Sequence, residues 1–289
     1  MSKLCLGTVQ FGTNYGIKND LGRQPDQQEV FNLLDKAVDS GIEYFDTASV
    51  YGTAENVLGN YGIGKKNVRV ISKLKPDAAV DEIEEEIKAS LQRLDLESLD
   101  GYLLHSAQDF YRSGVMQQLV RCKEKGLVKH IGVSVYDPED ALNVVRSKIC
   151  DYIQIPYNVF DRRWDKTDFF AIAKQNNVMV FARSAFLQGL LLMDIDKVPA
   201  NLTEAVPYLQ IFEKICRRYE FSKAEAAFLY SYVHSGIDKI VFGVETIAQL
   251  EDNLQIAAKN GKFSDCFAEL NENFNDIPRK IIIPSLWEK

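Results

Sequence analysis

The sequence has none of the features that mark several common protein classes. Its five cysteines are an odd number and form no Cys-x-x-Cys pair, which argues against a disulfide framework and predicts reduced, buried thiols. Its three histidines are dispersed and are not spaced to ligate a metal, so we expect no metal site. The net charge is −7 and no basic stretch is interleaved with aromatic residues, so we expect no nucleic-acid partner.

Two kinds of segment are also missing. No apolar run reaches the length of a membrane span, and the first residues, MSKLCLGTVQFG, do not form a secretion signal, so we expect no membrane association and a cytoplasmic location. Neither the Gly-x-Gly-x-x-Gly turn of a doubly wound dinucleotide-binding domain nor a Walker A phosphate loop occurs. These absences disfavour an open, doubly wound sheet.

The sequence does contain an alternation of short, β-rich apolar runs with longer stretches of helical period. Eight such units in 289 residues predict an α/β fold, a single (β/α)8 TIM barrel over residues 1–289, with 261–289 as a C-terminal tail that packs on or near the active-site face. The expected strands are Leu4–Val9, Glu43–Asp46, Arg69–Ser72, Gly101–Leu104, His130–Val133, Tyr152–Ile155, Val178–Ala182 and Lys239–Phe242.

Several predicted helices have recognisable first residues. Asp26 with Glu29, and Thr246 with Gln249, have the spacing of capping boxes. Asp137 precedes a proline, which predicts an N-cap followed by proline at the first helical position. The chain begins almost directly at the first strand, without a capping hairpin, so other residues must close the bottom of the barrel.

Four polar residues stand where predicted strands end, which is where the active sites of such barrels lie. Asp46 closes the second strand, Tyr51 follows one loop later, Lys73 closes the third strand and His105 the fourth. Each alone has an ordinary explanation as a turn, cap or solvated residue, but neighbouring strands would bring all four together. The four side chains together predict reduction of a carbonyl by hydride from a reduced nicotinamide.

Each of the four side chains has a part in that chemistry. A tyrosine can donate a proton to the carbonyl oxygen, and a nearby ammonium lowers a tyrosine's pKa from its ordinary value of about 10. A carboxylate beside the lysine keeps it charged and aimed, and a histidine can hydrogen-bond and orient the substrate oxygen. We therefore expect Tyr51 as the acid, with Lys73, Asp46 and His105 in these supporting roles.

The motifs that carry these residues resemble the aldo-keto reductase superfamily. The matching runs are FDTASVYG at 45–52, ISK at 71–73, LLH at 103–105 and IGVS at 131–134, and the similarity extends from LGT at 6–8 to GVETIAQLEDN at 243–253. The resemblance implies an NAD(P)H-dependent oxidoreductase that reduces an aldehyde or ketone. It also implies that the four residues above are a catalytic tetrad with Tyr51 as general acid.

The resemblance implies a cofactor site as well. Ser134 and Gln154 would hold the nicotinamide carboxamide, and the run RSAFLQGLL at 183–191 would pass over the pyrophosphate. The implied cofactor-contacting residues are Gly7, Thr8, Asp46, Ser134, Gln154, Arg183, Ser184, Phe186, Gln188, Gly189, Gly243, Glu245, Thr246, Gln249 and Asn253. NADPH is the default cofactor of the family, and NADH is the alternative.

Three positions depart from the family's pattern. Val135 stands where an asparagine usually follows the GVS serine, so one carboxamide contact is missing or replaced. Arg183 stands where an aromatic ring often stacks on the nicotinamide; a guanidinium plane can also stack, and its charge would disfavour the oxidised, cationic ring. Gln249 stands where many members carry a basic residue for the 2′-phosphate, and Glu245 adds negative charge. We expect Gln249 to cap its helix rather than contact a phosphate.

Other interpretations remain open from the sequence. Lys73 could form a Schiff base in a barrel lyase, or the chain could be a nicotinamide-sensing regulatory subunit with vestigial activity. Asp161, Arg162 and Arg163 are expected on a solvated surface, with a handle for an anionic substrate as the second interpretation. The expected partner is a small-molecule carbonyl substrate. Because GTVQFGTNYGI is similar to reductase-like proteins of bacterial surface-sugar pathways, sugar-derived carbonyls are included; the oligomeric state is not predicted.

Overall fold

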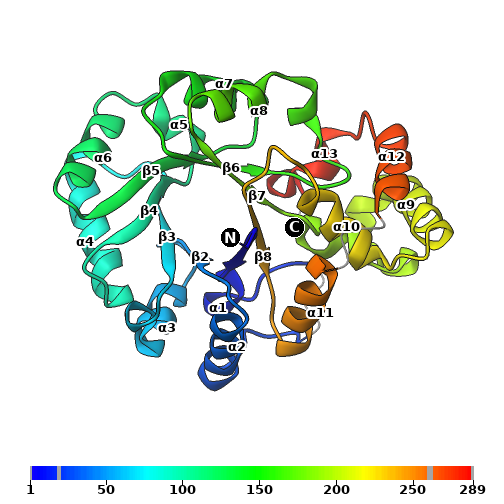
Figure 1. Cartoon of the computed structure of the whole chain (residues 1–289), viewed down its shortest axis with the longest axis horizontal. Helices are drawn as coiled ribbons and strands as arrows, with labels where there is room; N and C mark the ends of the chain where they lie inside the picture. Colours follow the sequence, from blue (N-terminus) through cyan, green and yellow to red (C-terminus); the bar gives the residue numbers. More distant parts are fainter. Residues whose placement is uncertain (1, 18–20, 259–262, 288–289) are drawn as a thin grey trace.

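Eight parallel strands form a closed barrel in which β8 pairs with β1, as the (β/α)8 prediction requires (Figure 1). The computed structural model describes residues 2–17, 21–258 and 263–287. The strands follow the order of the chain around the barrel. They are β1 (Leu4–Gly7), β2 (Tyr44–Asp46), β3 (Arg69–Leu74), β4 (Leu99–Leu104), β5 (Val128–Ser134), β6 (Tyr152–Pro156), β7 (Met179–Arg183) and β8 (Lys239–Gly243).

The predicted end of the first strand is wrong. The apolar alternation suggested a strand as far as Val9, but β1 ends at Gly7 and a short helix, α1 (Val9–Gly12), begins at Val9. The chain turns at Thr8, whose backbone N–H and hydroxyl both donate to the carbonyl oxygen of Asp46, at 2.9 and 3.1 Å. This turn places Phe11 in the core. The other predicted strands differ from the observed ones by no more than two residues at either end.

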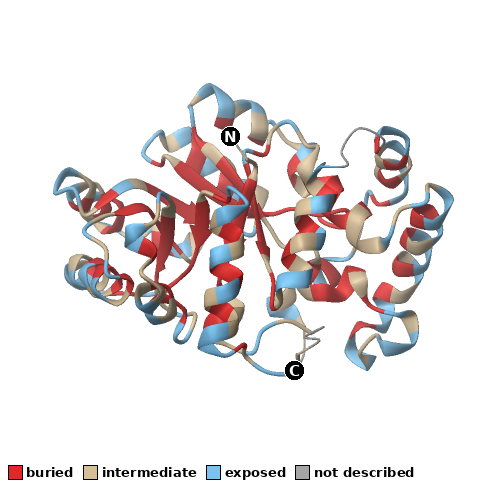
Figure 2. Ribbon diagram, turned by 60° about the horizontal axis from the view of Figure 1, so that its bottom comes forward, coloured by how far each residue is buried: buried red, intermediate tan, exposed pale blue. Residues whose placement is uncertain are grey.

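Helices surround the barrel and bury one face each against it (Figures 1 and 2). In α4 (Ile83–Leu94), for example, the buried residues are mainly apolar and the residues between them are largely polar. The buried apolar residues are Ile83, Ile87, Leu91 and Leu94. The remaining helices are α2 (Gln27–Asp39), α3 (Ala54–Tyr61), α5 (Ala107–Phe110), α6 (Val115–Glu124), α7 (Pro138–Ser147), α8 (Phe169–Gln175), α9 (Val206–Arg218), α10 (Lys223–Tyr232), α11 (Ile247–Ala258), α12 (Ser264–Asn273) and α13 (Arg279–Ile282).

The predicted helix starts have three different outcomes. The capping box of Asp26 and Glu29 is present at α2. At α11 only half of a box forms, because the backbone N–H of Gln249 donates to Thr246 while its side-chain oxygen accepts from the N–H of Glu245. Asp137 lies at the N-cap of α7, before the proline, but its side chain makes no cap hydrogen bond. That carboxylate is instead engaged by two arginines.

The barrel interior is filled by alternate residues of the strands, because successive side chains of a strand point to opposite faces. One buried cluster takes a residue from each of seven strands: Cys5, Tyr44, Ile71, Leu103, Tyr152, Phe181 and Val241. Figure 2 shows the strands as the most continuously buried part of the chain. The predicted burial of the five cysteines is confirmed, and all five are free thiols.

Aromatic and charged side chains at the strand starts close the bottom of the barrel. Tyr44 begins β2 and Tyr152 begins β6. The hydroxyl of Tyr44 accepts from Arg69 Nη1 at 2.6 Å, and Lys239 Nζ lies 4.4 Å from the centroid of the Tyr44 ring. Tyr152 donates its hydroxyl to Asp100 Oδ2 at 2.9 Å. These contacts fill the bottom of the barrel.

The C-terminal segment packs beside the strand ends. It contains α12, α13 and the short 3-10 helix η8 (Pro284–Leu286), with Ile281, Ile282 and Ile283 buried. Residues 261, 262, 288 and 289 of the predicted tail lie outside the described residues.

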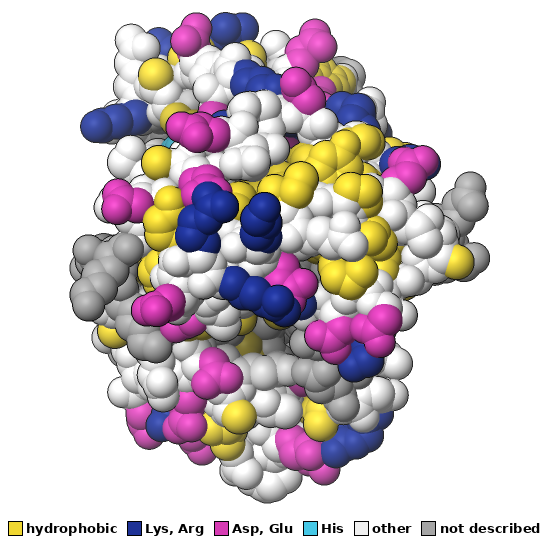
Figure 3. Space-filling view, turned by 90° about the vertical axis from the view of Figure 1, so that its right-hand side faces the viewer, with side chains coloured by type: hydrophobic (Ala, Val, Ile, Leu, Met, Phe, Trp, Pro, Cys, Tyr) yellow, Lys and Arg dark blue, Asp and Glu magenta, His cyan; other side chains and the backbone are white. Residues whose placement is uncertain are grey.

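On the face that carries α9 and α12, lysine and arginine side chains lie among aspartates and glutamates (Figure 3). In the part of the chain that the structure describes, no helix combines the length and the apolar character needed to cross a membrane.

Candidate active site

The four predicted catalytic residues meet at the C-terminal end of the barrel. Asp46, Lys73 and His105 each follow, by two residues, an inward-pointing residue of the interior cluster on β2, β3 and β4. The two-residue period of a strand therefore directs their side chains into the barrel mouth. Tyr51 joins them from the loop after β2, and its ring lies edge-on to the His105 ring with 5.7 Å between the centroids.

Lys73 is wholly buried and uses all three protons of its ammonium group. Its Nζ donates to Asp46 Oδ2 at 2.7 Å, to the carbonyl oxygen of Thr47 at 2.9 Å and to Tyr51 Oη at 3.3 Å. Burial opposes the positive charge, but the Asp46 carboxylate and Tyr51 outweigh it, so the pKa of Lys73 is raised above its ordinary value. Because the tyrosine oxygen accepts from Lys73, the tyrosine's own O–H is left to donate elsewhere.

Tyr51 is positioned by a close backbone contact between two glycines. Gly52 has φ of 55°, in the left-handed region, and a Cβ on it would lie 2.2 Å from the carbonyl oxygen of Gly12. A Cβ on Gly12 would lie 1.8 Å from the carbonyl oxygen of Tyr51. The glycine after the tyrosine is therefore required by packing against α1, and the tyrosine is held more tightly than an ordinary turn residue.

His105 is a neutral group in this environment. Burial, the Lys73 ammonium and the Arg183 guanidinium lower the pKa of His105 to about 3. Its Nδ1 is enclosed and has no hydrogen-bond partner in the described part of the chain, which leaves Nε2 as the nitrogen available to a ligand. A neutral imidazole with an N–H at Nε2 could donate a hydrogen bond to a substrate oxygen without changing charge.

A cavity of about 580 Å³ opens at these residues. Asp46, Tyr51 and His105 line it, whereas Lys73 lies behind them. Of the residues implied as cofactor contacts, all but Thr246 line the same cavity: Gly7, Thr8, Asp46, Ser134, Gln154, Arg183, Ser184, Phe186, Gln188, Gly189, Gly243, Glu245, Gln249 and Asn253. Its volume is in the range of ligand-binding sites. The contacts of these implied residues with a cofactor remain predictions.

Ser134 and Gln154 fit the carboxamide of a nicotinamide. They are paired in register between β5 and β6 and both are buried at the cavity wall. Gln154 donates through Nε2 to Asp46 Oδ1 at 2.9 Å, so its side-chain oxygen is turned away from that contact. Neither that oxygen nor the Ser134 hydroxyl has a hydrogen bond to any other described residue. A carboxamide needs one acceptor and one donor, which these two atoms can supply.

The other end of the cavity is acidic. Glu245, Asp252 and Asn253 line it, on or next to α11. Gln249 also lines it, and its side-chain oxygen accepts from the backbone N–H of Glu245 at 2.8 Å. The expected capping role of Gln249 is therefore confirmed in part. Among the described residues that line the cavity, Arg183 is the only lysine or arginine.

Several residues that line the cavity were not predicted from the sequence: Gln10, Tyr15, Tyr136, Leu192, Pro284 and Ser285. Tyr136 could have been predicted, because it stands two residues beyond Ser134 and so continues the series of β5 residues whose side chains point into the barrel. The two tail residues could not, because no strand or helix period connects them to the barrel mouth.

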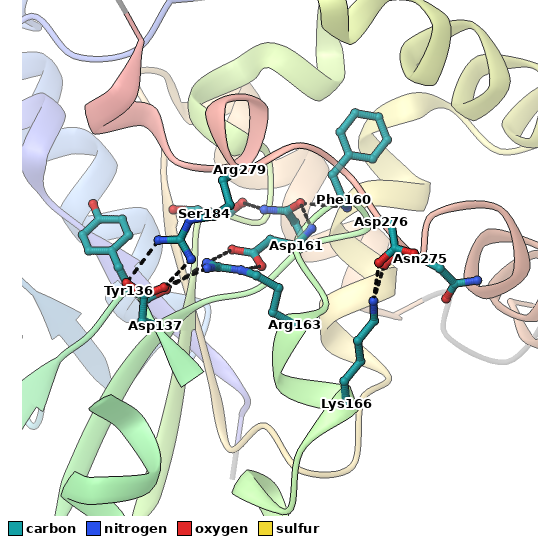
Figure 4. A network of polar contacts seen from close by, with 11 residues as sticks. Tyr136, Asp137, Phe160, Asp161, Arg163, Lys166, Ser184, Asn275, Asp276 and Arg279 are labelled. Carbon is teal, nitrogen blue, oxygen red and sulfur yellow. Dashed lines mark hydrogen bonds and ion pairs between the residues drawn. The ribbon is translucent and has the colours of Figure 1, made fainter. Parts of the chain in front are cut away.

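The loop after β6 is not the solvated surface that was expected. Asp161 is completely buried and is held by Arg163 through two hydrogen bonds of 2.8 and 3.0 Å (Figure 4). Burial raises the pKa of the Asp161 carboxyl, against the opposing effect of Arg163. Arg162 donates to the carbonyl oxygen of Asn271 at 2.6 Å. The C-terminal segment contacts this loop, and the sequence pattern could not reveal that contact.

The sequence model of the Aldo/keto reductase family matches residues 3–272. The chain belongs to the aldo-keto reductase family. This aldo-keto reductase is 25% identical to the NADH-specific methylglyoxal reductase of Escherichia coli (strain K12), with 93% of each chain covered. It is 22% identical to the protein named Uncharacterized oxidoreductase YqkF of Bacillus subtilis (strain 168), over 89% of this chain and 87% of that one.

A solved structure has the same fold. The aldo-keto reductase AKR11C1 of Bacillus halodurans, in its holo form, superposes with a TM-score of 0.78 at 19% identity, covering 97% of this chain and 95% of the other. Together with the family match, these relatives make the chain an oxidoreductase that uses a nicotinamide cofactor and acts on small carbonyl compounds.

Replacing Gly52 tests whether the backbone contact positions Tyr51. In Gly52→Ala the new Cβ must move away from Gly12, so we expect kcat to fall about 100-fold, as for a displacement of about 1 Å at a reacting group. Cofactor affinity should be unchanged. The matched control is Gly41→Ala, whose φ of 78° is similar but whose Cβ would meet nothing within 4 Å. Wild-type kcat in Gly52→Ala would contradict the positioning role.

The pKa of His105 predicts a pH effect on stability. Above about pH 6.5 the imidazole is neutral in both the folded and the unfolded chain and contributes nothing. Below that pH the unfolded chain binds a proton that folded His105 does not, so stability falls as the pH falls toward about 3. Between pH 7 and pH 5 the free energy of unfolding should fall by about 2 kcal/mol more in the wild type than in His105→Asn. Urea unfolding at both pH values measures this difference, and equal losses would show that His105 protonates normally.

Proposed function

We propose that this enzyme reduces an aldehyde or ketone to an alcohol, with Tyr51 as the proton donor. The observation that carries the proposal is the hydroxyl of Tyr51, which faces the cavity beside His105 and accepts a hydrogen bond from a buried, charged lysine. A reduced nicotinamide in the cavity would supply the hydride to the carbonyl carbon. Tyr51 would give its proton to the carbonyl oxygen, so that the alcohol leaves neutral.

The other residues support that transfer. The ammonium of Lys73 stabilises the negative charge that remains on the Tyr51 oxygen after the proton leaves. Asp46 keeps Lys73 charged and fixed, and also orients the Gln154 amide. His105 donates through Nε2 to the same carbonyl oxygen and so places the carbonyl within reach of Tyr51. The Ser134 hydroxyl and the Gln154 carbonyl oxygen would hold the nicotinamide carboxamide.

The contacts of Lys73 argue against a Schiff-base lyase. A nucleophilic amine must be neutral and must reach the substrate, but Lys73 has a raised pKa, three acceptors and no exposed surface. A nicotinamide-sensing subunit would retain the cavity without turnover. Steady consumption of the reduced cofactor with a simple aldehyde would count against that alternative. Methylglyoxal is a suitable first substrate, because one relative is named for its reduction.

We also propose that NADH is preferred over NADPH, the default implied by the resemblance. A 2′-phosphate at the α11 end of the cavity would face Glu245 and Asp252, with no lysine or arginine among the described lining residues there. Gln249, at the position expected to be basic, is neutral and caps the helix. The lack of a cation among the described residues at this end, together with the Asp252 carboxylate, supports NADH. The relative named as an NADH-specific reductase agrees with this direction.

Removing the phenolic hydroxyl tests the acid. Tyr51→Phe should lower kcat by about 100- to 10,000-fold, the usual contribution of a general acid, while the dissociation constant of NADH stays within error. Tyr111→Phe serves as the control, because Tyr111 is half exposed, bonds Asp140 and does not line the cavity. Stopped-flow reduction of methylglyoxal gives the rate, and an unchanged rate in Tyr51→Phe would exclude this tyrosine as the proton donor.

Cofactor choice can be measured without turnover. Quenching of protein fluorescence should give an NADH dissociation constant about 10-fold or more below that of NADPH, equivalent to about 1.4 kcal/mol. Glu245→Gln should narrow this ratio by improving NADPH binding alone, and Gln249→Arg should narrow it further. Tighter binding of NADPH than of NADH by the wild type would reverse the proposal.

A further inference from the structure

Arg183 carries a charge inside the cavity that forms no direct ion pair with any described residue. It ends β7, in register with Pro156 of β6, two residues beyond the interior residue Phe181. In the described part of the chain its guanidinium makes a single hydrogen bond, of 3.4 Å to Ser184 Oγ, and no ion pair. The guanidinium is a fork of five N–H donors that stays charged at physiological pH. Most of these donors are therefore free to bind a ligand.

The carboxylates near Arg183 are already committed to other arginines. Asp161 is held through both oxygens by Arg163, and Asp137 is bound by Arg163 at 3.1 Å and by Arg279 at 2.6 Å (Figure 4). Each of these two carboxylates is hydrogen-bonded by another arginine, and within the described residues Arg183 makes no hydrogen bond to either of them, although its charge also favours the ionised form of Asp161. A buried or half-buried charge without a partner is costly, so its position in a ligand cavity calls for an anionic ligand.

The neighbours of Arg183 place it at the end of the cavity that holds the reacting groups. Its Cζ lies 4.1 Å from the centroid of the Tyr136 ring, which follows β5, and its charge is close enough to lower the pKa of His105, which follows β4. The Glu245 end of the cavity follows β8. The stacked Tyr136 ring fixes the guanidinium plane and leaves its edge for a planar anion.

The charges beside the reacting groups leave a net positive site. Lys73 and Asp46 neutralise each other at 2.7 Å, and His105 is neutral above about pH 3. Among the described residues that line this end of the cavity, Arg183 is then the charged group without a direct ion-pair partner. An arginine fork binds a carboxylate or a phosphate through two parallel hydrogen bonds, which a neutral carbonyl compound cannot offer.

We propose that Arg183 binds an anionic group on the carbonyl substrate, a carboxylate or a phosphate, and so makes the enzyme selective for oxo acids or phosphorylated aldehydes. The inference rests on the proposed function, because it names the substrate class of the same site. Arg183 determines specificity, while Tyr51 and His105 act on the carbonyl itself.

Matched pairs of substrates test the selectivity. Each carboxylate is compared with its own amide: pyruvate with pyruvamide, 4-oxobutanoate with 4-oxobutanamide, and 4-formylbenzoate with 4-formylbenzamide. Glyceraldehyde 3-phosphate and glyceraldehyde form the phosphate pair. At saturating cofactor, we expect kcat/KM for the anionic member of at least one pair to exceed that of its partner about 10- to 100-fold, the usual effect of a charged hydrogen bond. Which pairs respond tells a carboxylate site from a phosphate site.

Variants then assign the preference to Arg183. Arg183→Gln should abolish the preference, because kcat/KM should fall about 10- to 100-fold further for the anion than for its neutral partner until the two values are equal. A loss shared equally by both members would report on the cofactor site, where Arg183 is also an expected contact. Arg183→Lys, which keeps the charge but loses the fork, should restore part of the preference. Arg279→Gln is the control, because it removes a positive charge beside the same mouth from a residue that does not line the cavity. It should retain the preference.

A binding measurement separates this inference from the proposed function. In the Tyr51→Phe background, loaded with cofactor, 4-formylbenzoate should bind about 10-fold or more tighter than 4-formylbenzamide, and Arg183→Gln should remove the difference. If no carbonyl is reduced but this difference holds, only the proposed function fails. Equal binding and equal kcat/KM within every pair would overturn the inference. So would an Arg183→Gln variant that weakens NADH and both members of each pair equally, since Arg183 would then serve the cofactor.

Discussion

The closed barrel imposes one constraint on which the site depends: side chains alternate between the inside and the outside of every strand. Each strand that places a bulky residue in the interior cluster must direct its residue two positions later into the mouth. Asp46, Lys73, Gln154 and Arg183 all occupy such positions, on strands that are far apart in the sequence. A shift of one residue in any strand register would move its functional side chain to the helix-covered face.

Within that frame, the ion pair of Lys73 and Asp46 sets the electrostatics of the mouth. A buried ion pair is weak evidence for stability, because desolvation offsets the attraction. Here the ion pair matters because Lys73 also contacts Tyr51. The Lys73 ammonium is fixed against the oxygen of Tyr51 and is too enclosed to react with substrate. The same charge helps to keep His105 neutral. Lys73 thus acts on both groups that would meet the carbonyl oxygen, because it hydrogen-bonds Tyr51 and helps to lower the pKa of His105.

The sequence was sufficient for features that depend on local period and spacing. Repeated apolar runs predicted the eight strands, and polar residues at the ends of those runs predicted which side chains meet at the barrel mouth. Val9 was assigned wrongly, because an apolar residue after a strand looks the same whether the strand continues or a helix begins. The burial of Asp161 could not be predicted, since it depends on Arg163 and on a C-terminal segment more than a hundred residues away. Tail residues such as Ser285 likewise reach the cavity through tertiary contacts that have no local signature.

The contribution of the last residues to the cavity bears on how the enzyme is made. Barrel closure needs β8 beside β1, and Arg279 attaches the C-terminal segment to Asp137 just before Pro284 and Ser285 reach the cavity wall. A chain still being synthesised can form its early βα units, because N-terminal parts fold first. It cannot yet enclose its ligand cavity. Competence to bind therefore arises only once residues 284 and 285 can pack against the barrel, and a chain truncated before them would keep its tyrosine, lysine and histidine around an unfinished cavity.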